Sequence, residues 1–320
     1  MPRNLKTLFI NPPWYRLQGL ISTYPPMGAS YMAAVLEQNG YESLIWNADY
    51  SETRVERISA GSHSRDDAEM TKSFEKYKNI LNGLTHPIWK EVEDTIRRVN
   101  PGIVGVTVNT SALKSAANIA LIAKKINPDI KVVFGGPHPT ILPEETIRTE
   151  NVDYVIRGEG ETSFLGLINS IAGGKTDFSG IPGLTYMKDG VVTSNPRAAN
   201  YEDPDSLPMP AKHLYLDRHK LPADVFSPIF TSRGCPFSCI YCGSFNIHGR
   251  KPRFRSPEKV IRELEIIRND FNCYNIVFCD DTFGVNLKHT NAILDAIIDS
   301  GLDITWVCQT RGVPPGINRR

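Results

Sequence analysis

The sequence has little net charge and no long apolar run, and each absence excludes a class of protein. Its 320 residues carry 36 lysines and arginines against 35 aspartates and glutamates, so no overall field favours nucleic acid or an anionic membrane. No apolar stretch reaches the length that crosses a bilayer, and the first residues show no signal-peptide pattern. We therefore expect no nucleic-acid partner, no membrane partner and a cytoplasmic location.

Cysteine is also scarce, and the sequence contains no internal repeat or low-complexity tract. Six cysteines in 320 residues of a protein in a reducing compartment are metal ligands or core residues rather than disulfide partners. Hydrophobic residues make up 41% of the chain and charged residues 22%, which is typical of a globular protein. The length allows two domains with separate cores.

The first half of the sequence alternates short apolar segments with helical patterns. We expect strands at residues 7–10, 43–46, 103–108, 132–134 and 154–156, and helices at residues 27–39, 115–126 and 161–171. This alternation predicts an α/β domain with a doubly wound parallel sheet covered on both faces. Such a sheet binds ligands in the crevice at the carboxyl ends of its strands.

Glycine and polar residues follow three of these expected strands. Glycine at a strand end lets a large flat ligand approach the backbone closely, although it can also serve only as a turn residue. The candidate ligand contacts are Asn109, Ser111, Gly135, Gly136, Pro137, Gly158, Glu159 and Gly160.

Two segments interrupt or follow the alternation. Residues 50–86 form an insertion, in which Ser64–Leu84 predicts a polar helix that packs over the crevice, against the second domain, or as a plain surface helix. Residues 182–196 predict a β-hairpin with an Asp189-Gly190 turn, and the proline-rich residues 197–225 suit a connector. We therefore expect domains at residues 1–175 and 226–320, with the hairpin and linker at 176–225.

Three cysteines on one short segment carry the strongest chemical signal. Cys235, Cys239 and Cys242 have the spacing Cys-x3-Cys-x2-Cys, with which three thiolates can hold three irons of a 4Fe–4S cluster. The fourth iron is then free to bind the amine and carboxylate of S-adenosylmethionine (SAM). The alternative is a zinc site, which needs a fourth ligand that His248 can supply.

The surroundings of this motif resemble the start of the radical SAM barrel. A strand precedes the cysteines, an aromatic residue (Tyr241) stands before the last one, and a helix begins near Ser256-Pro257-Glu258. The resemblance implies a reduced cluster that cleaves SAM to a 5′-deoxyadenosyl radical, with the protein setting the geometry. It also implies that Tyr241 lies against the adenine.

The strand ends of this second domain extend the resemblance. Asp280 and Asp281 follow its second strand, and by resemblance lie near SAM, although one of them can instead be only a helix cap. Gln309 and Arg311 follow the third strand and are expected to reach the SAM carboxylate or the substrate, for which the guanidinium fork of arginine is suited.

The first domain resembles the cobalamin-binding domain that precedes this barrel in one large class of radical SAM enzymes. The motifs that carry the likeness, within about residues 5–175, are Asn11-Pro12-Pro13, Pro26-Met27-Gly28, Gly135-Gly136-Pro137-His138 and Arg157-Gly158-Glu159-Gly160-Glu161. The family implies a Rossmann-like domain, a corrin ring over these loops, and a partial (βα) TIM-like barrel behind it.

The histidine pattern departs from many cobalamin proteins. Their motif Asp-x-His-x-x-Gly provides a lower cobalt ligand, but the loop from Asn11 to Gly19 contains no histidine. Asp217-x-His219 lies outside the domain, so we expect no cobalt ligand from this motif. His138 is the remaining candidate, and the alternative is that it only forms a hydrogen bond at its loop.

The predicted reaction follows from both resemblances. The lead hypothesis is methyl transfer to an unactivated carbon of a small-molecule substrate, with 4Fe–4S, SAM and cobalamin as cofactors and a reducing electron donor as partner. The alternatives are cyclisation or rearrangement without methylation, or a non-catalytic corrinoid- and iron–sulfur-binding protein. The chain supplies three of about six barrel units before Pro314-Pro315, and we therefore expect a truncated barrel. No catalytic residue is assigned.

Overall fold

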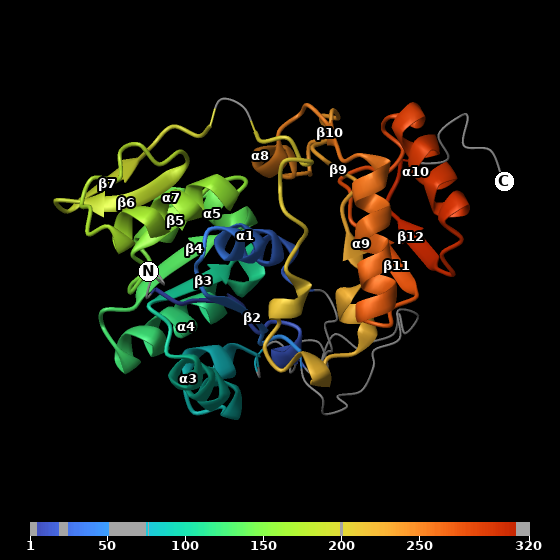
Figure 1. The fold of residues 1–320 in the computed structure, drawn as a ribbon. Coiled ribbons are helices and arrows are strands. Elements are labelled where there is room, and N and C mark those ends of the chain that lie inside the picture. The colour runs from blue at the N-terminus through green and yellow to red at the C-terminus, as the bar shows by residue number, and fades with distance from the viewer. Residues whose placement is uncertain (1–4, 19–24, 51–74, 76, 199–200, 312–320) are drawn as a thin grey trace.

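Two sheets form the two lobes of the protein, as Figure 1 shows for the computed structural model, which describes residues 5–18, 25–50, 75, 77–198 and 201–311. The larger sheet has the strand order β2-β1-β3-β4-β5-β6-β7. Its strands are β1 (Thr7–Asn11), β2 (Ser43–Asn47), β3 (Ile103–Thr107), β4 (Lys131–Gly135), β5 (Tyr154–Ile156), β6 (Leu184–Lys188) and β7 (Val191–Ser194). The first five are parallel and match the predicted segments closely, which confirms the doubly wound α/β fold.

Helices cover both faces of this sheet. The face with α3 (Pro87–Val99) and α4 (Leu113–Ile126) buries one apolar core, and the face with α1 (Met27–Gln38) and α7 (Glu161–Ala172) buries another. The short helices α5 (Pro137–Ile141) and α6 (Pro143–Ile147) follow β4. Only α1, α4 and α7 were predicted. The amphipathic helix α3, which buries Trp89, was missed.

The predicted hairpin belongs to the larger sheet. Asp189 (φ 50°) and Gly190 (φ 77°) both have positive φ, as the tight hairpin turn predicted for an Asp-Gly pair requires. Strand β6 pairs antiparallel with β5 and with β7. The hairpin therefore extends the sheet of the first lobe and ends its parallel part.

Most of the predicted helix Ser64–Leu84 lies outside the described residues, as does the Pro314-Pro315 segment. The described end of the helix packs into the first lobe, where Tyr77 and Leu81 are buried beside Trp89. Asn118 of α4 donates a hydrogen bond to the Leu81 carbonyl (2.9 Å). This end of the insertion is therefore part of the core between the sheet and the α3–α4 layer.

The second lobe is an open, partial barrel, as predicted. Its parallel strands β8 (Pro228–Ile229), β11 (Asn275–Phe278) and β12 (Thr305–Cys308) are connected through the helices α9 (Pro257–Asp270) and α10 (Leu287–Ser300). The core contains Leu264 and Ile293 from the two helices and Phe278 from β11. Among the described residues, no helix is long and apolar enough to cross a membrane.

The connector between the lobes contains a buried lysine, Lys212. The Lys212 ammonium donates to the carbonyls of Phe226 (2.8 Å) and Pro228 (2.7 Å) and lies 3.3 Å from the Glu263 carboxylate of α9. Burial lowers the pKa of Lys212, and the Glu263 carboxylate opposes that effect. The lysine thereby fixes the start of the second lobe.

Candidate cofactor sites

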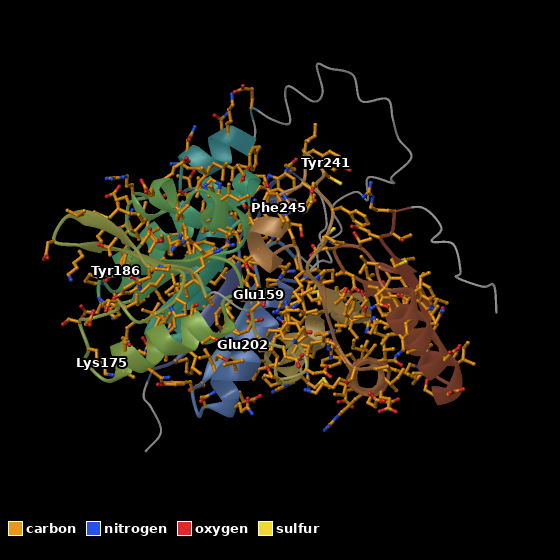
Figure 2. The ribbon with its side chains drawn as sticks, turned by 90° about the horizontal axis from the view of Figure 1, so that it is seen from above. Glu159, Lys175, Tyr186, Glu202, Tyr241 and Phe245 are labelled. Atoms are coloured by element: carbon orange, nitrogen blue, oxygen red, sulfur yellow. The ribbon has the colours of Figure 1, made fainter. Side chains whose placement is uncertain are left out.

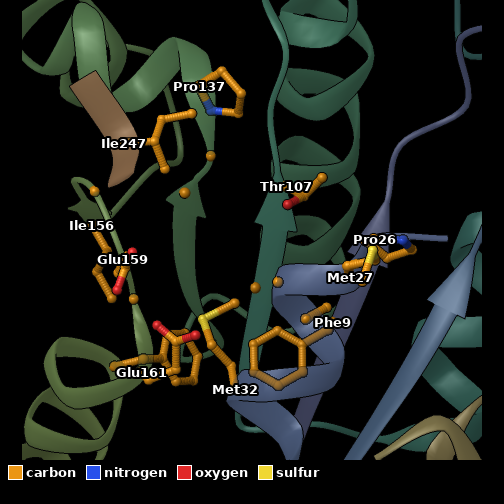
Figure 3. A pocket seen from close by; sticks show the side chains of 18 of the residues that line it. Phe9, Pro26, Met27, Met32, Thr107, Pro137, Ile156, Glu159, Glu161 and Ile247 are labelled. Carbon is orange, nitrogen blue, oxygen red and sulfur yellow. The ribbon is translucent and has the colours of Figure 1, made fainter. Parts of the chain in front are cut away.

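The larger sheet has a topological switch point, and a cavity lies there. The strand order reverses between β1 and β3, which is where doubly wound sheets bind ligands. The cavity has a volume of about 310 Å³, and Figure 3 shows its walls. Its residues are Phe9, Ile10, Pro26, Met27, Gly28, Ala29, Met32, Gly105, Val106, Thr107, Val133, Gly135, Gly136, Pro137, Ile156, Gly158, Glu159, Gly160, Glu161, Phe164, Phe230, Arg233, Ile247 and His248.

Six of the eight predicted ligand-loop residues lie on this wall. They are Gly135, Gly136, Pro137, Gly158, Glu159 and Gly160. Asn109 and Ser111 are exposed and are absent from the wall, where Thr107 occupies the end of β3 instead. The apolar side chains were missed, although the Pro26-Met27-Gly28 motif that opens α1 already pointed to this end of the sheet.

The wall glycines serve different purposes. Gly136 has φ 104°, and a Cβ atom there would lie 3.1 Å from the Val108 amide nitrogen, so the turn itself requires glycine. A Cβ atom on Gly28 would meet nothing within 4 Å. The turn interpretation therefore applies at Gly136, and the approach of a ligand to the strand-end glycines stays a prediction.

His138 forms a hydrogen bond at its loop. It is 2% exposed, its Nδ1 lies 3.2 Å from the Thr110 hydroxyl, and it does not line the cavity. The structure therefore favours the hydrogen-bonding alternative over a cobalt ligand. Asp217 of the other histidine motif pairs with Arg98 (2.8 Å) on α3.

The second lobe closes the cavity on one side. Phe230, Arg233, Ile247 and His248 reach its wall from the segments around the cysteines. Ile247 and His248 belong to the short helix α8 (Phe245–His248), and Figure 3 shows Ile247 on the same side of the cavity as Pro137. The cavity wall and the cysteine segment are therefore parts of one structure.

Buried ionised side chains join the lobes at this wall, where Figure 2 places Glu159 at their junction. The Glu159 carboxylate accepts from His248 Nδ1 (2.8 Å), lies 3.4 Å from Arg233, and receives both guanidinium nitrogens of Arg253. Arg233 also pairs with Glu161 (2.8 Å). Burial raises the pKa of Glu159, but His248, Arg253 and Arg233 outweigh it and lower the pKa to about 2.

The two ends of the cysteine loop, residues 234–252, lie next to each other in the fold. Its two ends are the short antiparallel strands β9 (Ser232–Arg233) and β10 (Arg253–Phe254), with Arg233 opposite Arg253. Asp281 accepts hydrogen bonds from the Gly234 amide (3.0 Å) and from the Ser244 hydroxyl, one on each side of the cysteines. These bonds fix the base of the loop.

The thiols of the loop fit an iron–sulfur cluster by donor type and spacing. Cys235, Cys239 and Cys242 are free thiols that are partly or fully exposed, and Tyr241 beside them is 89% exposed. Across the described part of the chain, no three His, Cys, Asp or Glu side chains are gathered to hold a metal ion. His248 contacts Glu159 through Nδ1, which leaves Nε2 for a metal, so this contact is compatible with the zinc alternative as well.

Replacing Gly234 with alanine is expected to destabilise the loop base by about 2 kcal/mol, because its φ is 96° and a Cβ atom would lie 2.9 Å from the Lys251 carbonyl oxygen. Urea unfolding followed by circular dichroism measures the change. The control is Gly180→Ala, where a Cβ atom meets nothing within 4 Å. Equal stability of the two variants would contradict the prediction.

The two predicted aspartates have different surroundings. Asp280 is 3% exposed and accepts from the Thr231 amide (2.6 Å) and the hydroxyls of Thr231 (2.5 Å) and Ser232 (2.7 Å). Burial raises its pKa, and these hydrogen bonds oppose the effect. Neither aspartate caps α10, because the residue in that position is Asn286.

The remaining predicted contacts lie around the cysteine loop and β12. The Arg311 guanidinium lies over the ring of Phe237, 4.1 Å from its centre, so it reaches the loop. Gln309 is exposed and its carbonyl accepts from the Phe283 amide (2.8 Å). Of the other cysteines, Cys308 packs partly buried against the core, and Cys273 is fully buried.

Comparisons with known proteins agree with this arrangement. Two family models match, B12 binding domain at residues 69–168 and Radical SAM superfamily at residues 229–315. The chain is 38% identical over 235 residues to the uncharacterized methyltransferase PH0819 of Pyrococcus horikoshii, a match that covers 72% of this chain and 51% of that protein. It is 26% identical over 319 residues to the anaerobic magnesium-protoporphyrin IX monomethyl ester cyclase of Rubrivivax gelatinosus, covering 96% and 50%.

A solved structure shows the same fold. It is the radical S-adenosylmethionine methyltransferase TsrM from Kitasatospora setae with cobalamin and a [4Fe-4S] cluster bound, with a TM-score of 0.66 at 18% identity, covering 94% of this chain and 51% of that one. The present chain spans about half the length of the relatives it matches. Fold and cysteine loop together define a two-domain radical SAM protein. The chain belongs to the radical SAM superfamily and carries a B12 binding domain ahead of its radical SAM domain.

Proposed function

We propose that this protein is a cobalamin-dependent radical SAM methyltransferase that acts on an unactivated carbon of a small molecule. The observation that carries the proposal is the shared wall: the cavity of the B12 binding domain is closed by Ile247 and His248, which lie within the cysteine loop, after Cys242. A corrinoid at the cavity and a cluster on the loop would therefore act on one space between the lobes.

The cluster ligands in this proposal are Cys235, Cys239 and Cys242. When bound, the cluster supplies the electron that opens SAM to a 5′-deoxyadenosyl radical, and cobalamin supplies the methyl group. Tyr241 and Arg311 lie on or against the loop and are proposed SAM contacts, as is Gln309, two residues before Arg311. Asp281 holds the loop base, whereas Asp280 is enclosed by its own hydrogen bonds.

The glycine loops around Gly135 and Gly158 are the proposed corrinoid contacts. A cavity of about 310 Å³ is at the small end of ligand pockets, so it takes one arm of cobalamin while the ring lies over the loops. Its walls are mostly apolar, which suits a flat aromatic group. The further partners we propose are a reducing electron donor and the small-molecule substrate, in the cytoplasm.

Ring formation without methylation is the second candidate, because the cyclase of Rubrivivax gelatinosus aligns with 96% of this chain. Product analysis separates the two. Methyl transfer with SAM as the methyl source leaves S-adenosylhomocysteine beside 5′-deoxyadenosine, whereas cyclisation leaves 5′-deoxyadenosine alone.

Removing one loop cysteine is expected to abolish the cluster. We expect the protein, purified without oxygen and reconstituted with iron and sulfide, to show a 4Fe–4S electron paramagnetic resonance signal that changes on addition of SAM. Cys239→Ala is expected to lose this signal, because two thiolates cannot retain the cube. Cys308→Ala, outside the loop, is the control and is expected to keep it. Bound zinc, or a folded wild-type protein without a cluster, would contradict the proposal.

A further inference from the structure

One group of buried ionised side chains joins the cavity to the cysteine loop, and we name it the Glu159 cluster. It consists of Glu159, Glu161, Arg233, His248 and Arg253. In the first lobe, Glu159 lies between β5 and α7, and Glu161 opens α7. In the second lobe, Arg233 and Arg253 flank the cysteine loop, and His248 lies within it. None of the five side chains is more than 19% exposed.

The three members of the Glu159 cluster that come from the second lobe each fix a different part of the cysteine loop. Arg233 stands directly before Gly234-Cys235, and its guanidinium also lies 4.6 Å from the ring centre of Tyr31 on α1. His248 ends α8, and Arg253 opens β10. Separating a buried ion pair costs much free energy, because the remaining charge is left buried without a partner. The Glu159 cluster therefore holds both the loop base and α8 to the first lobe.

Helix α8 belongs to both sites. It begins three residues after Cys242, and its Ile247 and His248 form cavity wall. It also packs against α5, which starts at the wall residue Pro137. A ligand in the cavity therefore contacts the segment whose position sets the end of the cysteine loop.

We propose that the Glu159 cluster makes the two cofactor sites interdependent, so that a corrinoid in the cavity and an iron–sulfur cluster on the loop each raise the affinity for the other. The inference rests on the proposed function. Its physical basis is that either ligand fixes α8 and the loop base, after which the second ligand no longer has to order them. Such coupling is reciprocal and typically changes affinity by about 5-fold to 150-fold.

The test uses cyanocobalamin as the cavity probe and iodoacetamide as the loop probe. In the apo protein, saturating cyanocobalamin is expected to slow the alkylation of Cys235 and Cys242 by about fivefold or more. Peptide mass spectrometry measures the rate of alkylation at each cysteine. In Arg253→Gln, whose substituted residue is not on the cavity wall, the slowing is expected to fall below about twofold. Arg253→Lys keeps the charge and is expected to keep part of the effect.

The second measurement is the dissociation constant of cyanocobalamin before and after cluster reconstitution. The wild-type protein is expected to bind cyanocobalamin at least about fivefold more tightly after cluster reconstitution than before it. Arg253→Gln is expected to bind it equally tightly in both states. Glu93→Gln, which removes an exposed ion-paired carboxylate on α3, is the matched control and should behave as wild type.

The outcomes separate this inference from the proposed function. Wild type that binds cyanocobalamin with no protection of the cysteines would overturn the coupling and leave the proposed function standing. Full protection in folded Arg253→Gln would also overturn it, because the probe would then only shield the loop directly. If that variant does not fold, Arg253→Lys replaces it, and protection in Arg253→Lys equal to that in wild type would overturn the coupling. Wild type that binds no cyanocobalamin would contradict the proposed function itself.

Discussion

Replacing Asp280 with alanine is expected to lower the free energy of unfolding by about 3 to 5 kcal/mol, the largest effect of any single change proposed for this protein. The carboxylate accepts three hydrogen bonds, from the amide and hydroxyl of Thr231 and the hydroxyl of Ser232. Alanine would leave these donors buried without an acceptor. Urea unfolding of wild type and variant, followed by circular dichroism, measures the difference.

Two companion variants sharpen this test. Asp280→Asn retains an acceptor oxygen and is expected to lose less, about 1 to 2 kcal/mol. Asp299→Ala removes an exposed carboxylate from α10 and is expected to stay within about 0.5 kcal/mol of wild type. If Asp280→Ala were as stable as Asp299→Ala, the hydrogen bonds from Thr231 and Ser232 to the Asp280 carboxylate would not stabilise the fold.

Acid is expected to weaken the contact between the lobes through Glu159. Its pKa in the folded protein is about 2 against 4.5 when unperturbed, so the ionised form stabilises the fold above pH 4.5 and the effect is lost as pH falls toward 2. The difference corresponds to about 3 kcal/mol when complete, and about 1 to 1.5 kcal/mol of it is lost by pH 3.5. Arg253 and Arg233 are the charged groups that face it, and His248 donates a hydrogen bond to it.

Glu159→Gln isolates this contribution from the other carboxylates, which titrate in both proteins. The stability gap between wild type and Glu159→Gln, from urea unfolding at pH 7 and pH 3.5, is expected to shrink by about 1 to 1.5 kcal/mol at the lower pH. Glu93→Gln serves again as the surface control. A gap that stays constant with pH would show that the Glu159 carboxylate is not held by the three cations.

Sequence patterns predicted the five parallel strands of the larger sheet well because each is a short apolar run that ends at, or within two residues of, a glycine, proline or asparagine. The Asp189-Gly190 turn was equally clear, since few residue pairs accept two positive φ angles. Helix α3 was missed although Ile88, Trp89 and Val92 have helical spacing, because it directly follows the insertion that was set apart as irregular. The pairing of the hairpin with β5 is a long-range contact that local patterns do not encode.

The candidate site was predicted in outline from motifs at strand ends, and the contacts between the lobes were not. Glu159 was expected to face a cofactor and does line the cavity, and its carboxylate also contacts three side chains that lie 74 to 94 positions later in the chain. Only the folded structure brings Arg233, His248 and Arg253 to one carboxylate. Sequence spacing alone could not separate Asp280, which is enclosed, from Asp281, which braces the cysteine loop.

The paired strands β9 and β10 also bear on how the protein matures in the cell. Because the cysteine loop leaves and returns at adjacent residues, Arg233 and Arg253, the polypeptide around it can complete its fold while the loop is still empty. Newly synthesised protein would then await iron as a finished scaffold, and metal delivery becomes a late step of biogenesis that need not accompany translation.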